Sequence, residues 1–211
     1  SMQAMVDEAV AKPILIGRKS VMQATIDRLS LRFKLGEEVE VFDPKDCDLH
    51  DRYWQHYHKK VARKGVSVET AKQEMRNNAT ALASVMVDLG EAHGMICGKI
   101  GRFDTHFKTL FQVLGPKTPG THVSTVCALL LPSGPLFLTD AFLTVDPTTE
   151  HIVSSTEASM DFVRQFGIKP KVALLSHSNF GTSSDYQANK MRQASATLRE
   201  RYPNEEIEGE M

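Results

Sequence analysis

Short apolar runs and helical segments alternate along the first half of the chain. Apolar runs closed by glycine or by an Asp-Pro turn predict strands at 13–17 and 39–42. Helices are expected over 3–11, 21–29 and 51–64, the last of them rich in aromatic and basic residues. This alternation is typical of an α/β protein.

The clearest helical pattern of the sequence follows at 67–89. Ser67 can cap its start and Gly90 ends it. Apolar residues recur between them at steps of three and four, with Asn78 at one of these positions. We therefore expect one uninterrupted helix.

The segments after this helix lead to the best internal boundary of the chain. The run at 92–98 predicts a buried strand in which Cys97 is an inert thiol, and 103–114 predicts a helix. Segment 115–120 then holds two prolines and two glycines, which is typical of a connection between compact parts. This boundary divides the chain into two partial lobes, 3–118 and 119–211.

The second lobe begins with a predicted hairpin. Apolar runs at 123–131 and 136–139 are joined by a Pro-Ser-Gly-Pro turn, which is too short for a crossover between parallel strands. Asp146 is expected to cap the helix that follows. The further elements expected are helices at 148–166 and 185–201 and strands at 171–175 and from 207.

Together these elements predict an α/β fold of two lobes. Each lobe is expected to be a three-layer αβα arrangement, with a mainly parallel sheet between helices. The helix at 3–11 has no strand before it, and the strand at 206–211 has nothing packed after it. We therefore expect the sequence to be cut from a longer protein at both ends.

Composition narrows the class of protein. The 211 residues are 41% hydrophobic and 24% charged, with a net charge of −1 and no basic stripe, so a nucleic-acid partner is not expected. The longest apolar run is far too short to span a membrane. Three cysteines without paired spacing argue against a structural zinc and fit a reducing cytoplasm. No metal site is expected in this chain.

Two loops of the first lobe combine glycine with positive charge. Ligands of open α/β sheets bind beyond the carboxyl ends of strands, where the loops 17–20 and 98–104 are expected to lie. Each can hold an anion or be an ordinary turn, and for 17–20 the turn is favoured. Neither loop has the glycine spacing of a nucleotide-binding motif.

The second lobe offers the richer strand-end chemistry. Asp140 follows a strand directly, and the loop 176–185 surrounds one glycine with small polar side chains that suit hydrogen bonding to phosphate or carbonyl oxygens. His177 lies between Ser176 and Ser178, but the motif and the placed aspartate of a catalytic triad are missing. No catalytic residue is assigned.

Several segments resemble the phosphate acetyltransferase (phosphate acetyl/butyryltransferase) family in order and spacing. They are KPILIGR at 12–18, RKGVS at 63–67, MICG at 95–98, TDAFLTVDPTTE at 139–150, FGIKPKVALLSHSNFG at 166–181, KMRQA at 190–194 and EIEGEM at the end. The resemblance implies the two-lobed fold of isocitrate and isopropylmalate dehydrogenases, with a cleft between the lobes.

Within this family the chain is most similar to the domain fused behind bacterial NADP-dependent malic enzymes. The segments RYWQHYHKK, GRFDTHFK and LLSHSNFG carry that likeness. Lys108 takes the place of an arginine that holds phosphate in the free-standing enzymes. The position of their second anion-holding arginine corresponds to a site near Val61 in this chain. Lysine cannot form the bidentate fork of arginine on phosphate.

This resemblance implies a regulatory role. Acetyl-CoA would be the effector, the second lobe would form homo-oligomers, and malic enzyme catalytic domains with NADP and Mg²⁺ or Mn²⁺ would belong to the same polypeptide. The alternatives are a genuine transferase that moves acetyl or butyryl between phosphate and CoA, and a pure oligomerisation scaffold. The residues expected to contact an acyl-CoA are Asp140, Ser176, Ser178, Asn179, Gly181, Thr182 and Lys108.

Overall fold

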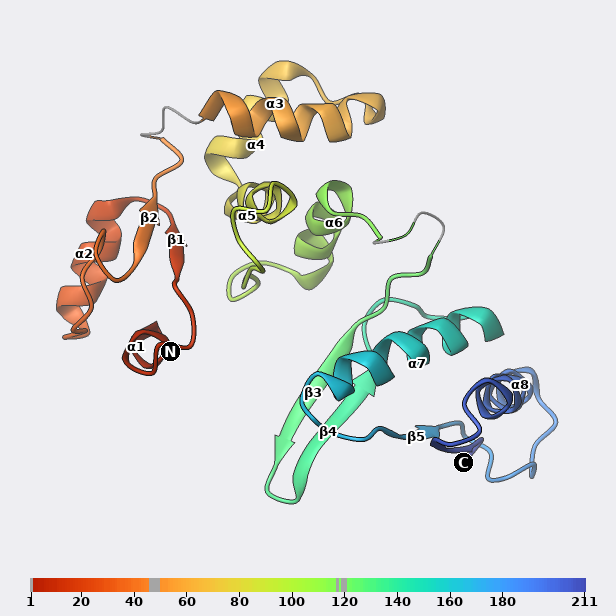
Figure 1. The fold of residues 1–211 in the computed structure, drawn as a ribbon. Coiled ribbons are helices and arrows are strands. Elements are labelled where there is room, and N and C mark those ends of the chain that lie inside the picture. The colour runs from red at the N-terminus through yellow and green to blue at the C-terminus, as the bar shows by residue number, and fades with distance from the viewer. Residues whose placement is uncertain (1, 46–49, 117, 119–120) are drawn as a thin grey trace. The chain divides into compact units, whose positions relative to one another are not determined.

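The computed structural model describes residues 2–45, 50–116, 118 and 121–211, which fall into two compact units, Ser1–Gly115 and Pro116–Met211 (Figure 1). The helices and strands of the first unit are α1 (Met2–Asp7), β1 (Ile14–Ile16), α2 (Lys19–Arg28), β2 (Glu40–Phe42), α3 (His50–Val61), α4 (Val68–Asn77), α5 (Ala79–Asp88) and α6 (Phe103–Val113).

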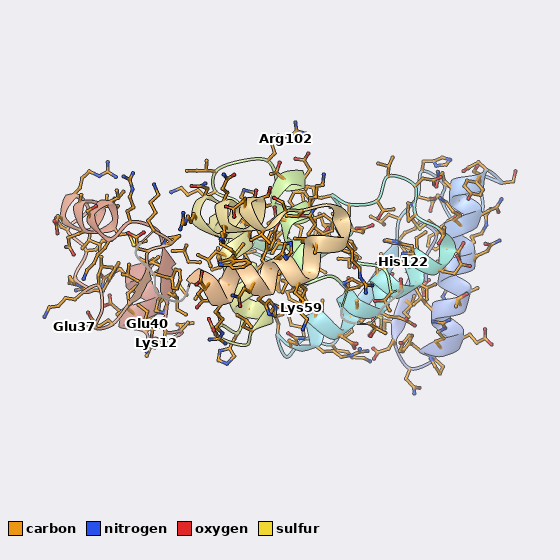
Figure 2. All side chains as sticks on the ribbon, turned by 90° about the horizontal axis from the view of Figure 1, so that it is seen from above. Lys12, Glu37, Glu40, Lys59, Arg102 and His122 are labelled. Atoms are coloured by element: carbon orange, nitrogen blue, oxygen red, sulfur yellow. The ribbon has the colours of Figure 1, made fainter. Side chains whose placement is uncertain are left out.

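The first unit is built around a small parallel sheet and a helical core. Strands β1 and β2 run parallel, with Ile14 opposite Glu40 and Ile16 opposite Phe42. An ion pair between Lys12 and Glu40 lies beside them (both are labelled in Figure 2). The main core contains fully or nearly fully buried side chains from α3, α4, α5 and α6, among them Tyr53, Tyr57, Val61, Met75, Leu82, Val85 and Val113.

The prediction of a single helix over 67–89 is wrong, because the helix is interrupted at Asn78. Ser67 does cap α4 as predicted, by accepting a hydrogen bond from the backbone N–H of Thr70. Asn78 has extended backbone angles, and its side chain accepts from the N–H groups of Thr80 and Ala81, both at 3.1 Å. Its amide therefore starts α5 where the apolar pattern predicted only continuation, since asparagine competes well for cap positions.

The buried strand expected at 92–98 is also wrong. Ile96 is 92% exposed and Cys97 is an exposed free thiol. Among the described residues of this unit, the strands β1 and β2 pair only with each other. An apolar run without a neighbouring strand has no partners for its backbone N–H and C=O groups, so it stays irregular here.

The second unit contains a hairpin, two long helices and a second parallel pair of strands. Its elements are β3 (Val126–Leu131), β4 (Gly134–Thr139), α7 (Thr149–Arg164), β5 (Lys171–Leu174), α8 (Tyr186–Arg201) and β6 (Glu206–Gly209). Strands β3 and β4 are antiparallel, which confirms the predicted hairpin, and β5 runs parallel to β6. Side chains from α7, α8, β5 and β6 form its core, including Ile152, Met160, Leu174, Leu198 and Ile207.

The hairpin presents much apolar surface. Leu130 is 87% exposed, and Leu129, Leu131, Leu136 and Leu138 are exposed as well. Exposed apolar patches of this kind usually mark a contact surface.

The α/β class is confirmed, with smaller sheets than the sequence indicated. The described strands form two parallel pairs and one antiparallel pair. The three-layer arrangement, the dehydrogenase-like topology and the cleft stay predictions. In the part of the chain that the structure describes, we find no helix with the length and apolarity needed to cross a membrane.

We expect Asn78→Ala to lower the free energy of unfolding by about 1 kcal/mol, because two N–H groups at the start of α5 lose their acceptor. Urea unfolding followed by circular dichroism measures the change. The exposed neighbour Asn77, changed to alanine, is the matched control and should lose far less. Equal losses for the two variants would show that the cap is not what starts α5.

Candidate functional site

The polar loop 176–185 joins β5 to α8 and is held together by its own hydroxyl groups. The Ser178 side chain is almost fully buried, and its Oγ accepts from the N–H of Ser183 at 3.0 Å. The N–H of Ser178 donates to Ser176 Oγ at 2.9 Å, and the N–H of Asn179 donates to Thr182 Oγ1 at 3.0 Å. The structure thus brings the predicted residues Ser176, Ser178, Asn179, Gly181 and Thr182 into one compact turn.

A buried carboxylate, that of Glu210, lies at the centre of this turn. Its side chain is 0% exposed. Oε1 accepts from Ser178 Oγ at 2.7 Å and from the N–H of Gly181 at 2.8 Å, while Arg192 Nη1 donates to Oε2 at 2.8 Å. The Gly181 N–H, the Ser178 hydroxyl and the Arg192 charge lower the pKa of Glu210. Two of the donors that the sequence offered to a phosphate, the Ser178 hydroxyl and the Gly181 N–H, are therefore bound to the chain's own carboxylate.

Two further contacts hold the loop to its neighbours. Arg192 Nη2 donates to the carbonyl oxygen of Ser183 at 2.8 Å, so one guanidinium contacts both the loop and Glu210. The backbone of β6 continues beneath the loop, where the N–H of Ser176 donates to the carbonyl oxygen of Met211 at 2.8 Å. A Cβ added at Gly209 would lie 2.5 Å from the Leu174 carbonyl oxygen, so only glycine allows this close approach of the strands.

His177 and Asp185 form an exposed pair at the end of the loop. His177 Nε2 lies 2.8 Å from Asp185 Oδ2, with 63% of the imidazole side chain exposed. The Ser183 hydroxyl, the N–H of Ala188 and the nearby imidazole lower the pKa of Asp185 to about 2. Asp185 also caps α8. In the described loop Ser176 Oγ donates to the Ser178 carbonyl and Ser178 Oγ to Glu210, so no Ser-His-Asp triad forms.

Asp140 lies in a different cluster, at the carboxyl end of β4. Its Oδ2 is 3.1 Å from His151 Nε2, which also lies 3.2 Å from Thr144 Oγ1. The rings of His151 and His122 are 4.5 Å apart between centroids (His122 is labelled in Figure 2). Oδ1 of Asp140 and Oγ1 of Thr125 are buried and have no hydrogen-bond partner among the described residues. The N–H of Asp140 donates to the Thr125 carbonyl oxygen, so the two residues with these unpaired side-chain oxygens are direct neighbours.

The predicted cap role of Asp146 is wrong. Thr148 caps α7 instead, because its side chain accepts from the N–H of His151. Asp146 forms an ion pair with the buried Lys190 of α8 and accepts from Gln187 at 3.2 Å. Lys190 also donates to the carbonyl of Pro147 at 2.8 Å. This aspartate therefore ties the 140–149 segment to α8.

The first unit holds the remaining predicted residue and both glycine-rich loops. Lys108 is exposed on α6. In the loop 98–104, Arg102 forms two hydrogen bonds of 3.0 Å with Asp104, and His106 Nε2 lies 2.7 Å from the Ile100 carbonyl oxygen. The arginine of this loop is thus paired with an exposed carboxylate, and the anion site and the ordinary turn both stay predictions.

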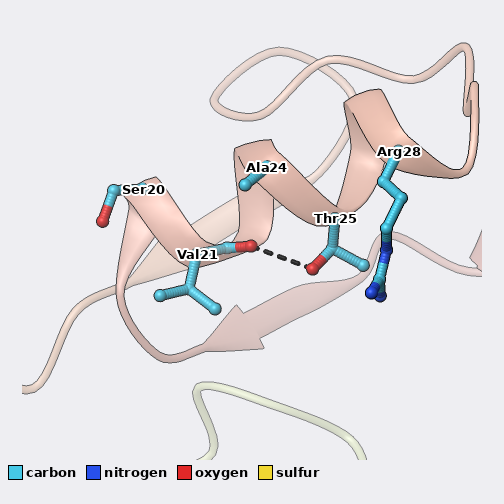
Figure 3. A pocket seen from close by; sticks show the side chains of 5 residues that line it. All are labelled: Ser20, Val21, Ala24, Thr25 and Arg28. Atoms are coloured by element: carbon cyan, nitrogen blue, oxygen red, sulfur yellow. Dashed lines mark hydrogen bonds between the residues drawn. The ribbon is translucent and has the colours of Figure 1, made fainter.

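The loop 17–20 borders a charged hollow beyond the carboxyl ends of β1 and β2. This hollow has a volume of about 200 Å³ and is lined by Arg18, Lys45 and Arg76 together with Asp43. A second hollow lies on the outer face of α2, where the Thr25 hydroxyl donates to the Val21 carbonyl oxygen (Figure 3). No group of three or more histidine, cysteine or carboxylate side chains suited to a metal occurs among the residues that the structure describes.

Similarity to known proteins extends over the whole chain. The family model described as phosphate acetyl/butaryl transferase matches residues 1–211. The NADP-dependent malic enzyme of Salmonella typhimurium is 42% identical over 210 residues, which are 99% of this chain and 28% of that protein. The phosphate acetyltransferase of a Synechocystis species is 26% identical over 206 residues, or 98% of this chain and 29% of that protein. The chain thus spans little more than a quarter of these relatives.

Solved structures support the fold. The EutD phosphotransacetylase from Staphylococcus aureus superposes with a TM-score of 0.80 at 20% identity, covering 100% of this chain and 64% of that one. A phosphotransacetylase from Streptococcus pyogenes gives a TM-score of 0.84 at 21% identity, covering 98% and 62%.

Asp185 predicts a specific pH dependence of stability. Because its folded-state pKa is lowered to about 2, the carboxylate stabilises the fold above the usual aspartate value near 4, and this contribution is lost as pH falls toward 2. Asparagine keeps the cap but removes the charge. The difference in unfolding free energy between the wild type and Asp185→Asn, from urea titrations, should therefore shrink between about pH 5 and pH 2. A difference that does not vary with pH contradicts this assignment.

His151→Ala should lower the free energy of unfolding by about 1–3 kcal/mol, because it removes the partner of a buried carboxylate oxygen of Asp140. His93→Ala is the matched control, since that imidazole is exposed. Thermal unfolding of both variants gives the comparison. Similar stabilities of the two variants would mean that the Asp140 contact contributes little.

Proposed function

The chain belongs to the phosphate acetyl/butaryl transferase family, and we propose that it is the acetyl-CoA-sensing regulatory and oligomerisation domain of a larger NADP-dependent malic enzyme. One observation carries this choice. The malic enzymes of Salmonella typhimurium and Escherichia coli are 42% and 40% identical to the chain over 210 residues, whereas the Synechocystis phosphate acetyltransferase is 26% identical.

The local chemistry supports binding without acyl transfer. A transferase acting on acyl-CoA and phosphate must orient a phosphate oxygen for attack on the thioester carbonyl. At the position where the family's free-standing enzymes hold phosphate with arginine, this chain has Lys108, which offers a point charge in place of a planar fork. The guanidinium of Arg192, for its part, is bonded to Glu210. Both features reduce the means of positioning phosphate.

The effector is proposed to contact the outward side of the polar loop. Asn179, Gly181 and Thr182 are exposed there, whereas Ser178 is buried, and both the Ser178 hydroxyl and the Gly181 N–H are bonded to Glu210. Ser178 therefore supports the loop and leaves direct contacts to its neighbours. Asp140 and Ser176, each following a strand, complete the proposed contacts of this unit, and Lys108 is a separate proposed contact in the first unit.

The catalytic steps of malate conversion are assigned to other parts of the proposed polypeptide. Oxidation and decarboxylation of malate with NADP and Mg²⁺ or Mn²⁺ need a metal site, and the described residues of this chain provide no suitable cluster. Acetyl-CoA would change malate turnover by binding one conformational state of the whole enzyme better than another.

The β3–β4 hairpin is the proposed contact between copies of the chain. Four of its exposed leucines, Leu129, Leu131, Leu136 and Leu138, lie on one face of the two paired strands, because Leu129 is opposite Leu136 and alternate residues of a strand share a face. A second copy brings the same surface, so a two-fold symmetric dimer would bury both patches at once.

Calorimetric titration of acetyl-CoA into the full-length polypeptide that contains this domain tests the effector role. We expect saturable binding and a change in malate turnover, and Asn179→Ala should weaken binding about fivefold, as the loss of about one hydrogen bond implies. Asn204→Ala, which also removes an exposed amide of the second unit, should leave affinity unchanged. Absence of heat together with unaltered turnover would rule out sensing. Formation of acetyl phosphate from acetyl-CoA and phosphate at an enzymatic rate would favour the transferase instead.

Leu136→Lys should shift the full-length protein toward smaller oligomers in sedimentation velocity, because a charge then enters an apolar contact. The matched control is Leu29→Lys, which places lysine at a similarly exposed leucine of the first unit and should leave the oligomer intact. An unchanged distribution for Leu136→Lys would exclude the leucine face of the hairpin as the contact between copies.

A further inference from the structure

We propose that Ser178, Gly181 and Arg192 form a binding site for a small carboxylate or a similar oxyanion, and that Glu210 fills this site as a built-in occupant. The proposal concerns contacts within the second unit. It does not depend on the identity of the effector or on the activity of the whole protein.

The site is defined by donors that converge from two separate segments. Ser178 Oγ and the Gly181 N–H come from the loop and reach Oε1 at 2.7 and 2.8 Å, and Arg192 Nη1 comes from α8 and reaches Oε2 at 2.8 Å. A hydroxyl, a backbone amide and a guanidinium around two oxygens are the donors that proteins use for carboxylates and phosphates. The arrangement thus matches a bound anion, except that the anion is the side chain of Glu210, which follows β6 in the same chain.

The loop geometry is adapted to this occupant. Gly181 adopts a φ of +86°, in the left-handed region that favours glycine. Its N–H donates to the carboxylate in this conformation. The following residue also helps, because Thr182 Oγ1 lies 3.3 Å from Ser178 Oγ. The donors are therefore held in place by loop contacts that do not involve Glu210 itself.

An occupied site has a regulatory consequence. While Glu210 is in place, an external oxyanion cannot use these three donors, so it must compete with a tethered carboxylate at high effective concentration. Movement of the segment after Gly209 would free the donors and open the site. The loop is thereby coupled to the end of β6, and any event that displaces this end exposes a cationic, hydrogen-bonding pocket.

An ordinary structural ion pair makes a different prediction. If Glu210 merely neutralises Arg192, losing its side chain should weaken the fold in a way that no small carboxylate can repair. If the donors form a preorganised oxyanion site, formate should enter the space left by the side chain and restore the contacts.

The test is chemical rescue of Glu210→Ala in the 211-residue chain. Unfolding midpoints and the NMR shift of the Gly181 amide are measured in sodium formate and in sodium chloride at equal ionic strength. We expect formate, and not chloride, to raise the midpoint of Glu210→Ala and to return the Gly181 amide saturably toward its wild-type position. Wild-type protein should show no saturable shift, because its site is filled.

Two variants serve as controls. Glu208→Ala removes a carboxylate of β6 two residues before Glu210, one that pairs with Arg199 on the surface, and should not respond to formate beyond chloride. Arg192→Ala combined with Glu210→Ala removes one of the donors and should abolish the rescue. Should Glu210→Ala fail to fold in chloride, folding in formate would support the proposal. Equal behaviour in the two salts, folded or unfolded, would overturn it.

Discussion

A carboxylate taken out of water must find donors inside the protein, and this need organises the polar loop of the second unit and its neighbours. Glu210 is fully buried, so the energetic cost of its desolvation has to be offset by charge-assisted hydrogen bonds. Ser178, Gly181 and Arg192 supply them. The loop 176–185, the helix α8 and the end of β6 are joined through this one group.

Local signals in the sequence were sufficient for most helices and for the hairpin. Ser67 caps α4 and the Pro-Ser-Gly-Pro turn joins β3 to β4, because caps and tight turns depend on residues close in the chain. Two errors have a common cause. Both predictions rested on hydrophobicity alone. At Asn78 the side chain caps a new helix, and the 92–98 run has no neighbouring strand among the described residues with which to pair.

The candidate site was foreseeable only in part. The rule that ligands bind beyond the carboxyl ends of strands led to Asp140 and to the loop 176–185. It could not indicate that Glu210 would occupy the loop, since the two are separated by about 30 positions and a glutamate next to a strand usually faces solvent. The contact between Asp140 and His151 escaped for the same reason, because it joins a strand end to a helix through space.

The buried glutamate also sets an order of events during biosynthesis. Translation delivers residues from the N-terminus, so the polar loop leaves the ribosome well before residue 210 does. Until then the Ser178 hydroxyl and the Gly181 N–H lack the carboxylate that they bind in the folded unit. Nascent chains that stall before Gly209 would therefore display these donors without their occupant.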